Sequence, residues 1–166
     1  MSPVHIHLVL NHLPVVGLAF ITLLLLVAFA RRSGELTKVA LAFLAVIGAV
    51  SVAVFLTGEP AEEAVEMLDG VSEAMIESHE EVALIALIAA VTVGAIALAT
   101  LVILRKRTVP RWVTGSALVL TLAVLGVMGV TANSGGQIRH SEIRASGAAA
   151  RGAFPEADEE SVERDH

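Results

Sequence analysis

The sequence predicts an all-α fold, an integral membrane four-helix up-down bundle with both chain ends on the outer side of the bilayer. Two observations lead to this prediction. Of the 166 residues, 55% are hydrophobic and the mean hydropathy is +0.78, whereas soluble domains are about 45–50% apolar. In addition, four long apolar runs contain no Lys, Arg, Asp or Glu, namely residues 13–30, 39–56, 82–104 and 112–131.

Each apolar run is long enough to cross a bilayer as a helix. The runs have 18 to 23 residues, and a helix rising about 1.5 Å per residue needs roughly 20 residues to cross about 30 Å of hydrocarbon. Helix is favoured over strand because an open strand leaves backbone groups unpaired in lipid. The first run is followed, not preceded, by Arg31 and Arg32, which argues against a cleaved signal peptide.

The charges of the loops predict the orientation. Arg31, Arg32 and Lys38 lie between the first two runs, and Arg105, Lys106, Arg107 and Arg111 lie between the last two. Residues 58–81 contain nine carboxylates and no Lys or Arg. Positive-inside bias therefore places the basic loops in the cytoplasm, in a multi-pass protein of the cytoplasmic (inner) membrane. The first, third and fourth helices are expected to extend beyond the outer surface.

Composition also excludes several other classes of protein and predicts how the chain divides into domains. The absence of Cys excludes disulfides, thiolate ligands and covalent c-type haem attachment. No basic patch with interleaved aromatic residues indicates nucleic-acid binding, and no set of catalytic residues is predicted. We expect a membrane domain at residues 1–144 and a disordered acidic tail at 145–166. A homo-oligomer is compatible with the sequence.

The histidines are the most informative polar residues. Five of them, from three segments, fall at the predicted outer end and none at the cytoplasmic edge: His5, His7, His12, His79 and His140. Interfacial positions tolerate histidine, but imidazole is also the commonest metal ligand and a usual axial ligand of haem. We expect His12 and His79 to form the first ligand pair. His140 with His7 or His5 would form the second and would allow another haem.

The sequence leaves open the conformation of the segment before the first apolar run, which contains His5, His7 and His12. His5 and His12 are seven residues apart and share a face if this segment is helical. Pro14 instead favours a helix that begins near Asn11 or His12, in which case the segment before it is not helical.

Carboxylates near the histidines give a second type of candidate site. Glu59 and Glu63 lie in a predicted short helix that begins with Pro60, and Glu80 follows His79 directly. With His7, His12, His79 and His140 they are candidate ligands for copper or zinc, although a solvated acidic face is the simpler explanation of the carboxylates. The HExxH motif is absent, and so is the pair of ExxH motifs that carboxylate di-iron bundles contain. A di-iron site is therefore disfavoured.

The segment after the last apolar run contains Gly135, Gly136 and Arg139. Two glycines permit a helix stop, a kink or the close approach of a flat ligand. Arg139 is a candidate partner for haem propionates, and the acidic loop is the simpler alternative.

Four segments carry a resemblance to known families. Residues 5–14 (HIHLVLNHLP), 57–63 (TGEPAEE), 76–81 (IESHEE) and 135–143 (GGQIRHSEI) resemble, in the same order, the motifs of a family of small, uncharacterised bacterial four-helix membrane proteins. The chain is also distantly similar to a broader membrane family whose sequences open with a His-Pro…Val-His-Phe-Pro pattern. This resemblance implies binding of haem b. Here Ser2-Pro3 and Leu13-Pro14 stand at the corresponding positions.

Three functions follow as hypotheses. The first is a membrane b-type cytochrome or haem-binding electron-transfer subunit, with one or two bis-histidine haems near the outer face and a quinol or an extracytoplasmic redox partner. The second is a copper or zinc site built from the same His and Glu residues. The third is a structural or interaction subunit of a membrane complex. A transporter is disfavoured because no charged residue lies mid-membrane.

Overall fold

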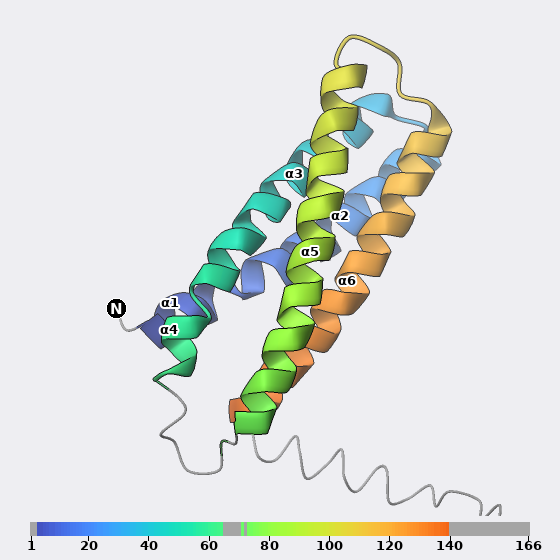
Figure 1. Ribbon diagram of the computed structural model, residues 1–166. Coiled ribbons are helices and arrows are strands. Elements are labelled where there is room, and N and C mark those ends of the chain that lie inside the picture. Colours follow the sequence, from blue (N-terminus) through green and yellow to red (C-terminus); the bar gives the residue numbers. More distant parts are fainter. Residues whose placement is uncertain (1–2, 65–70, 72, 140–166) are drawn as a thin grey trace, which may run out of the picture.

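The computed structural model describes residues 3–64, 71 and 73–139, and within these ranges all regular structure is helical. The helices follow in the order α1 (Pro3–Leu10), α2 (His12–Arg31), α3 (Gly34–Leu56), α4 (Glu59–Glu62), α5 (Glu73–Leu104) and α6 (Arg111–Arg139) (Figure 1). Helices α2, α3, α5 and α6 contain the four apolar runs, so the all-α prediction with four long apolar helices is confirmed. The predicted acidic tail at 145–166 lies outside the described residues.

Two of the long helices exceed the length that a bilayer requires. Helix α5 has 32 residues and α6 has 29, against roughly 20 for a span. Both continue as helix beyond the apolar run toward His79 and Gly135. The four helices are long and apolar enough to cross a membrane, with hydropathy of 2.1 to 2.8 in their most apolar windows.

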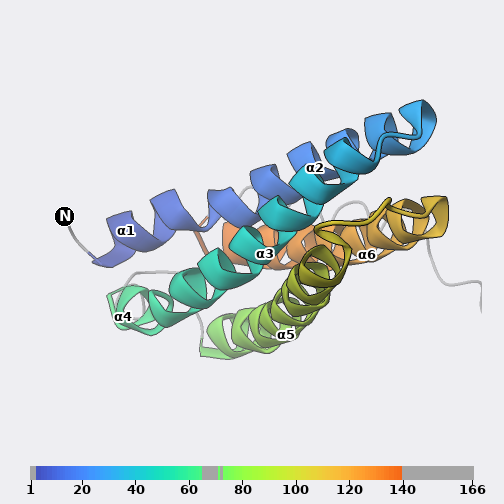
Figure 2. The same ribbon diagram turned by 90° about the horizontal axis from the view of Figure 1, so that it is seen from above.

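The four long helices pack in a ring. Helix α2 contacts α3 and α6, and α5 contacts the same two helices from the other side. Consecutive long helices run in opposite directions (Figures 1 and 2). The α2–α3 and α5–α6 connections therefore share one end of the molecule, while α1 and α4 lie beside each other at the opposite end.

Local chemistry explains where the helices stop and start. Arg32 adopts a left-handed conformation with φ of 54°, and its N–H bonds back to the last turn of α2. Ser33 then caps α3 by accepting a hydrogen bond from the N–H of Leu36 at 3.3 Å. Near the amino terminus, Pro14 has no N–H for the carbonyl of Leu10, which separates α1 from α2 at Asn11. The histidine segment before Asn11 is nevertheless helical.

The closest helix crossing depends on two glycines. A Cβ atom at Gly48 of α3 would lie 3.0 Å from the carbonyl oxygen of Ala90, and one at Gly94 of α5 would lie 3.1 Å from Cα of Gly48. These contacts are with backbone, which cannot rotate away. Glycine at both positions therefore lets α3 and α5 approach backbone to backbone, as is typical of helices packed in membranes.

Most of the outward surface of the long helices is apolar. Phe20 is 56% exposed, Val46 56%, Ile88 59% and Val119 66%, one from each of α2, α3, α5 and α6. Inside, small and branched residues such as Leu25, Ala40 and Ala97 are almost fully buried. Apolar side chains on both the inner and the outer surface are characteristic of helices that lie in lipid.

Buried hydroxyl groups are paired with helix carbonyls. Thr22 and Thr121 each donate to the carbonyl four residues earlier, at 2.8 and 2.7 Å. The hydroxyls of Thr37 and Thr114 are 2.9 Å apart and connect α3 with α6 near the end that carries the basic loops. These bonds satisfy polar atoms that would otherwise destabilise an apolar interior.

Candidate functional site

His7 is held at the end of α1 by a hydroxyl group of α3. Its Nδ1 lies 3.1 Å from Oγ1 of Thr57, the residue that ends α3. The Thr57 hydroxyl donates its own proton to the carbonyl of Val54 at 2.7 Å, so its oxygen accepts from the imidazole. In neutral His7 the proton is therefore on Nδ1 and the lone pair is on Nε2.

His79 on α5 has the same arrangement with a residue of α6. Its Nδ1 lies 2.9 Å from Oγ of Ser134, and the Ser134 hydroxyl donates to the carbonyl of Thr131 at 2.9 Å. Thr131 in turn donates to Val127 on its own helix. Neutral His79 accordingly carries its proton on Nδ1 and presents Nε2 as the unprotonated nitrogen.

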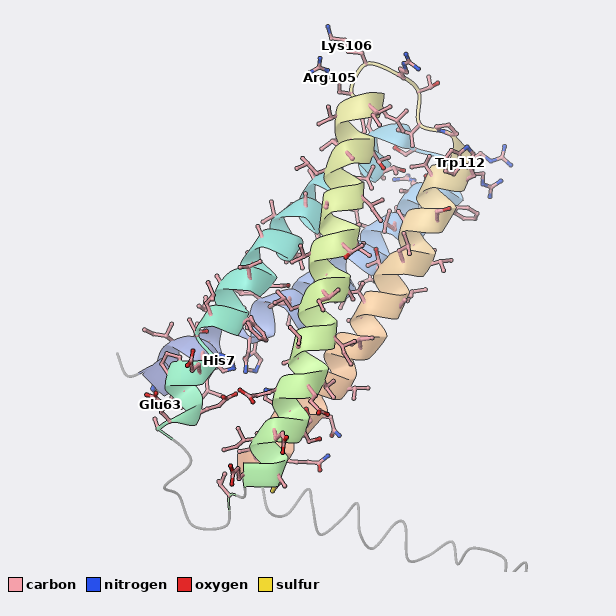
Figure 3. The ribbon with its side chains drawn as sticks, in the orientation of Figure 1. His7, Glu63, Arg105, Lys106 and Trp112 are labelled. Carbon is pink, nitrogen blue, oxygen red and sulfur yellow. The ribbon has the colours of Figure 1, made fainter. Side chains whose placement is uncertain are left out.

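The two imidazoles lie near each other although 72 positions separate them in the sequence. Both are half-buried, and they are close enough for a positive charge on His7 to disfavour one on His79. Figure 3 places His7 and Glu63 at one end of the molecule and Arg105, Lys106 and Trp112 at the other. The fold thus brings His7 and His79 together at the end opposite the basic loops.

Glycines shape the space around both rings. A Cβ atom at Gly135 would lie 3.0 Å from Cε1 of His79 and within 3.5 Å of both ring nitrogens, so the imidazole lies against the backbone of α6. At Gly58 a Cβ atom would be 3.8 Å from Cε1 of His7. Helix α6 continues through Gly135 and Gly136 to Arg139, so these glycines do not end the helix. In this structure the flat group beside Gly135 is the ring of His79.

Asn11 adds a polar atom without a partner. Its Oδ1 is buried and accepts no hydrogen bond within the described part of the chain. Asn11 lies one helical turn after His7, and its N–H bonds to the carbonyl of His7 at 2.9 Å. Buried polar atoms are nearly always paired, so this acceptor marks a position where a further polar group is expected.

The other predicted site residues within the described part of the chain are more exposed than this pair. His12 is exposed, and its Nδ1 donates to the carbonyl of Leu8, in the last turn of α1, at 2.7 Å. His5, Glu59, Glu63 and Glu80 are also exposed, although the charge of Glu80 acts on His79. Within residues 3–64, 71 and 73–139, no three His, Asp or Glu side chains are grouped so as to hold a metal ion. His140 and the side chain of Arg139 lie outside the described residues.

The hydroxyl partners have a weaker sequence signal than the histidines. Thr57 and Ser134 each follow a long apolar run and can bond the carbonyl three residues earlier, as many helical Ser and Thr residues do. That pattern does not identify which imidazole each hydroxyl will meet.

Comparison with known proteins found no family model, no curated protein and no solved structure that matches this chain.

Proposed function

We propose that this chain is a small membrane-embedded b-type cytochrome, an electron-transfer subunit in which His7 and His79 are the axial ligands of one haem. The observation that supports it is the presence of two imidazoles from separate helices, each with its Nδ1 bonded to a hydroxyl group. Haem-ligating and metal-ligating histidines characteristically donate their second N–H to a fixed acceptor, which sets the tautomer and the orientation of the ring.

The donor set suits haem better than a bare metal ion. The porphyrin supplies four ligands to iron, so two imidazoles complete its coordination, whereas protein zinc sites use three or four side chains. Bound haem supplies one-electron redox chemistry. The protein groups hold its ligands: Thr57 and Ser134 fix the two rings, and Gly135 leaves room for that of His79. The buried Oδ1 of Asn11 offers an acceptor to a hydroxyl donor such as a quinol.

The proposal includes an orientation in the cytoplasmic membrane. The four long helices span the bilayer as an up-down bundle, with the basic α2–α3 and α5–α6 connections in the cytoplasm. The amino terminus, α4 and the histidine pair then lie on the outer side. There a bound haem would be positioned to exchange electrons with an extracytoplasmic redox partner or with a quinol in the membrane.

Histidine variants test the ligand assignment. His7→Ala and His79→Ala are each expected to lose the low-spin reduced spectrum of the detergent-purified protein, because each removes one axial ligand. His12→Ala is the matched control and is expected to keep the spectrum, since that imidazole is exposed and bonded to the backbone carbonyl of Leu8 four residues earlier. Added imidazole should restore part of the signal in His7→Ala, which separates ligand loss from unfolding.

The opposite pattern would reassign the site. If His12→Ala abolished the spectrum and His7→Ala left it unchanged, the ligands would be His12 and another histidine. Copper or zinc in place of haem would indicate a site completed by carboxylates, and a folded protein with no bound group would support an interaction subunit.

A further inference from the structure

A second site lies at the end of the molecule opposite the histidines. There α5 and α6 diverge toward the loop that joins them (Figures 1 and 2), and a groove of about 110 Å³ opens between them with α3 as its floor. On the order of 150 Å³ of apolar space is enough to hold a benzene molecule, so this groove has room for a short stretch of hydrocarbon chain.

The lining of the groove is apolar and its rim is aromatic. Leu41 and Leu44 of α3 form the floor, Ile96 lines the α5 side, and Trp112 and Leu120 line the α6 side. Trp112 is 72% exposed and Ile96 is 48% exposed. Tryptophan is enriched where membrane helices meet the headgroup layer, which places the open end of the groove at that depth in the proposed orientation.

Cations without ion-pair partners lie above the groove. The loop from Arg105 to Pro110 joins the two helices that form its walls, and Arg105, Lys106 and Arg107 are exposed. Within the described residues, the salt bridge of the protein joins Lys38 to Glu35, so these three cations have no carboxylate partner there. Figure 3 shows Arg105, Lys106 and Trp112 at this same end.

We infer that this groove binds an anionic phospholipid, with part of an acyl chain between α5 and α6 and the phosphate beside Arg105 and Lys106. The inference rests on the proposed placement of the helices in a bilayer and is independent of haem. Charge complementarity selects the occupant, because basic pockets between membrane helices on the cytoplasmic side bind anionic headgroups. A zwitterionic lipid would fill the groove equally well but would not gain from the unpaired cations.

The single tryptophan of the chain provides the measurement. Trp112 is the one Trp in the sequence, and it lines the groove. The protein is reconstituted into vesicles of phosphatidylcholine and phosphatidylglycerol in which only one lipid carries brominated acyl chains, and quenching of Trp112 fluorescence then reports which lipid is its neighbour. We expect about a five-fold enrichment of phosphatidylglycerol, which corresponds to about 1 kcal/mol for a nearby cation.

Two pairs of variants separate the charge from the groove. Arg105→Gln with Lys106→Gln should remove the enrichment, whereas Arg31→Gln with Arg32→Gln removes two cations at the same end and should leave it. Ser116 lines the groove, so Ser116→Phe should fill it and lower the enrichment of phosphatidylglycerol. Val119→Phe, on the outward surface of α6, should leave the enrichment unchanged. None of these changes should alter a haem spectrum.

The outcomes distinguish this inference from the proposed membrane placement. Equal quenching by both brominated lipids, or equal loss in both charge variants, would overturn the lipid site and leave the bilayer placement intact. No quenching by either lipid would contradict insertion of the helices, and with it the lipid site.

Discussion

At the scale of single residues, two hydroxyl groups determine what the paired imidazoles present to a ligand. Thr57 and Ser134 each commit their proton to a backbone carbonyl, and each therefore accepts from Nδ1 of a histidine. The same tautomer results at His7 and at His79. A site in which both Nε2 atoms are unprotonated is prepared to bind a metal centre, since the proton need not be displaced from the ligating nitrogen.

Gly135 offers a test of this geometry at one residue. Gly135→Ala would place a Cβ atom 3.0 Å from Cε1 of His79, so the ring must move from its bond with Ser134. We expect haem affinity to fall by about 10-fold or more, the usual cost of losing a partner that orients a ligand. Gly136→Ala is the control, because no atom lies within 4 Å of its added Cβ. Haem titration of both proteins gives the comparison, and equal affinities would contradict the role of Gly135.

The sequence predicts both histidines of the candidate site, but it does not predict that His7, and not His12, is half-buried as His79 is. His7 and His79 were both among the predicted ligands, and their placement at one end followed from the apolar runs. From the sequence, the expected first ligand pair is His12 with His79, and His7 or His5 joins His140 in the second. In the structure the helical segment before Asn11 carries His7 toward α3 and α5, whereas His12 is exposed. Rotation about a helix axis near a proline depends on tertiary packing, which spacing alone cannot supply.

At the scale of the helices, the structure depends on close contact between α3 and α5. Sequence alone predicted the four long helices because each apolar run is uninterrupted by charge. It does not predict that Gly48 and Gly94 meet at a helix crossing. Partner choice among apolar helices is set by the fit of their surfaces, and that fit requires the three-dimensional arrangement.

Glycine substitutions test the crossing directly. Gly48→Ala and Gly94→Ala should each lower the free energy of unfolding by about 1–3 kcal/mol, because the added methyl group meets backbone atoms that must be pushed apart. Gly126→Ala and Gly129→Ala meet no atom within 4 Å and should be neutral or stabilising by about 0.5–1 kcal/mol. Unfolding in detergent, followed by circular dichroism, measures all four. Similar losses in both pairs would mean that the crossing is not tight.

At the scale of the whole molecule, the two ends carry different chemistry. One end has the histidine pair and the acidic α4, and the other has the basic connections and Trp112 (Figure 3). If the chain is the proposed cytochrome, its orientation in the membrane decides on which side electrons enter or leave. The bias of Lys and Arg toward two short loops is the sequence feature that predicts the direction.

Single cysteines test that orientation, since the chain has no native Cys. Glu63→Cys should react with a membrane-impermeant maleimide added to whole cells, because α4 is placed outside. Lys106→Cys should react only after the membrane is opened. Both positions are exposed, so a difference in labelling reports sidedness. The reverse pattern would place the histidine pair in the cytoplasm.

The visible absorption spectrum of the purified chain, as isolated and after dithionite, tests the central claim most directly. The protein should come from cells supplied with a haem precursor, and its haem content should be measured against protein. The account predicts about one haem per chain, a strong Soret band, and sharp α and β bands on reduction, as two imidazole ligands give. A featureless spectrum from correctly folded protein would contradict it.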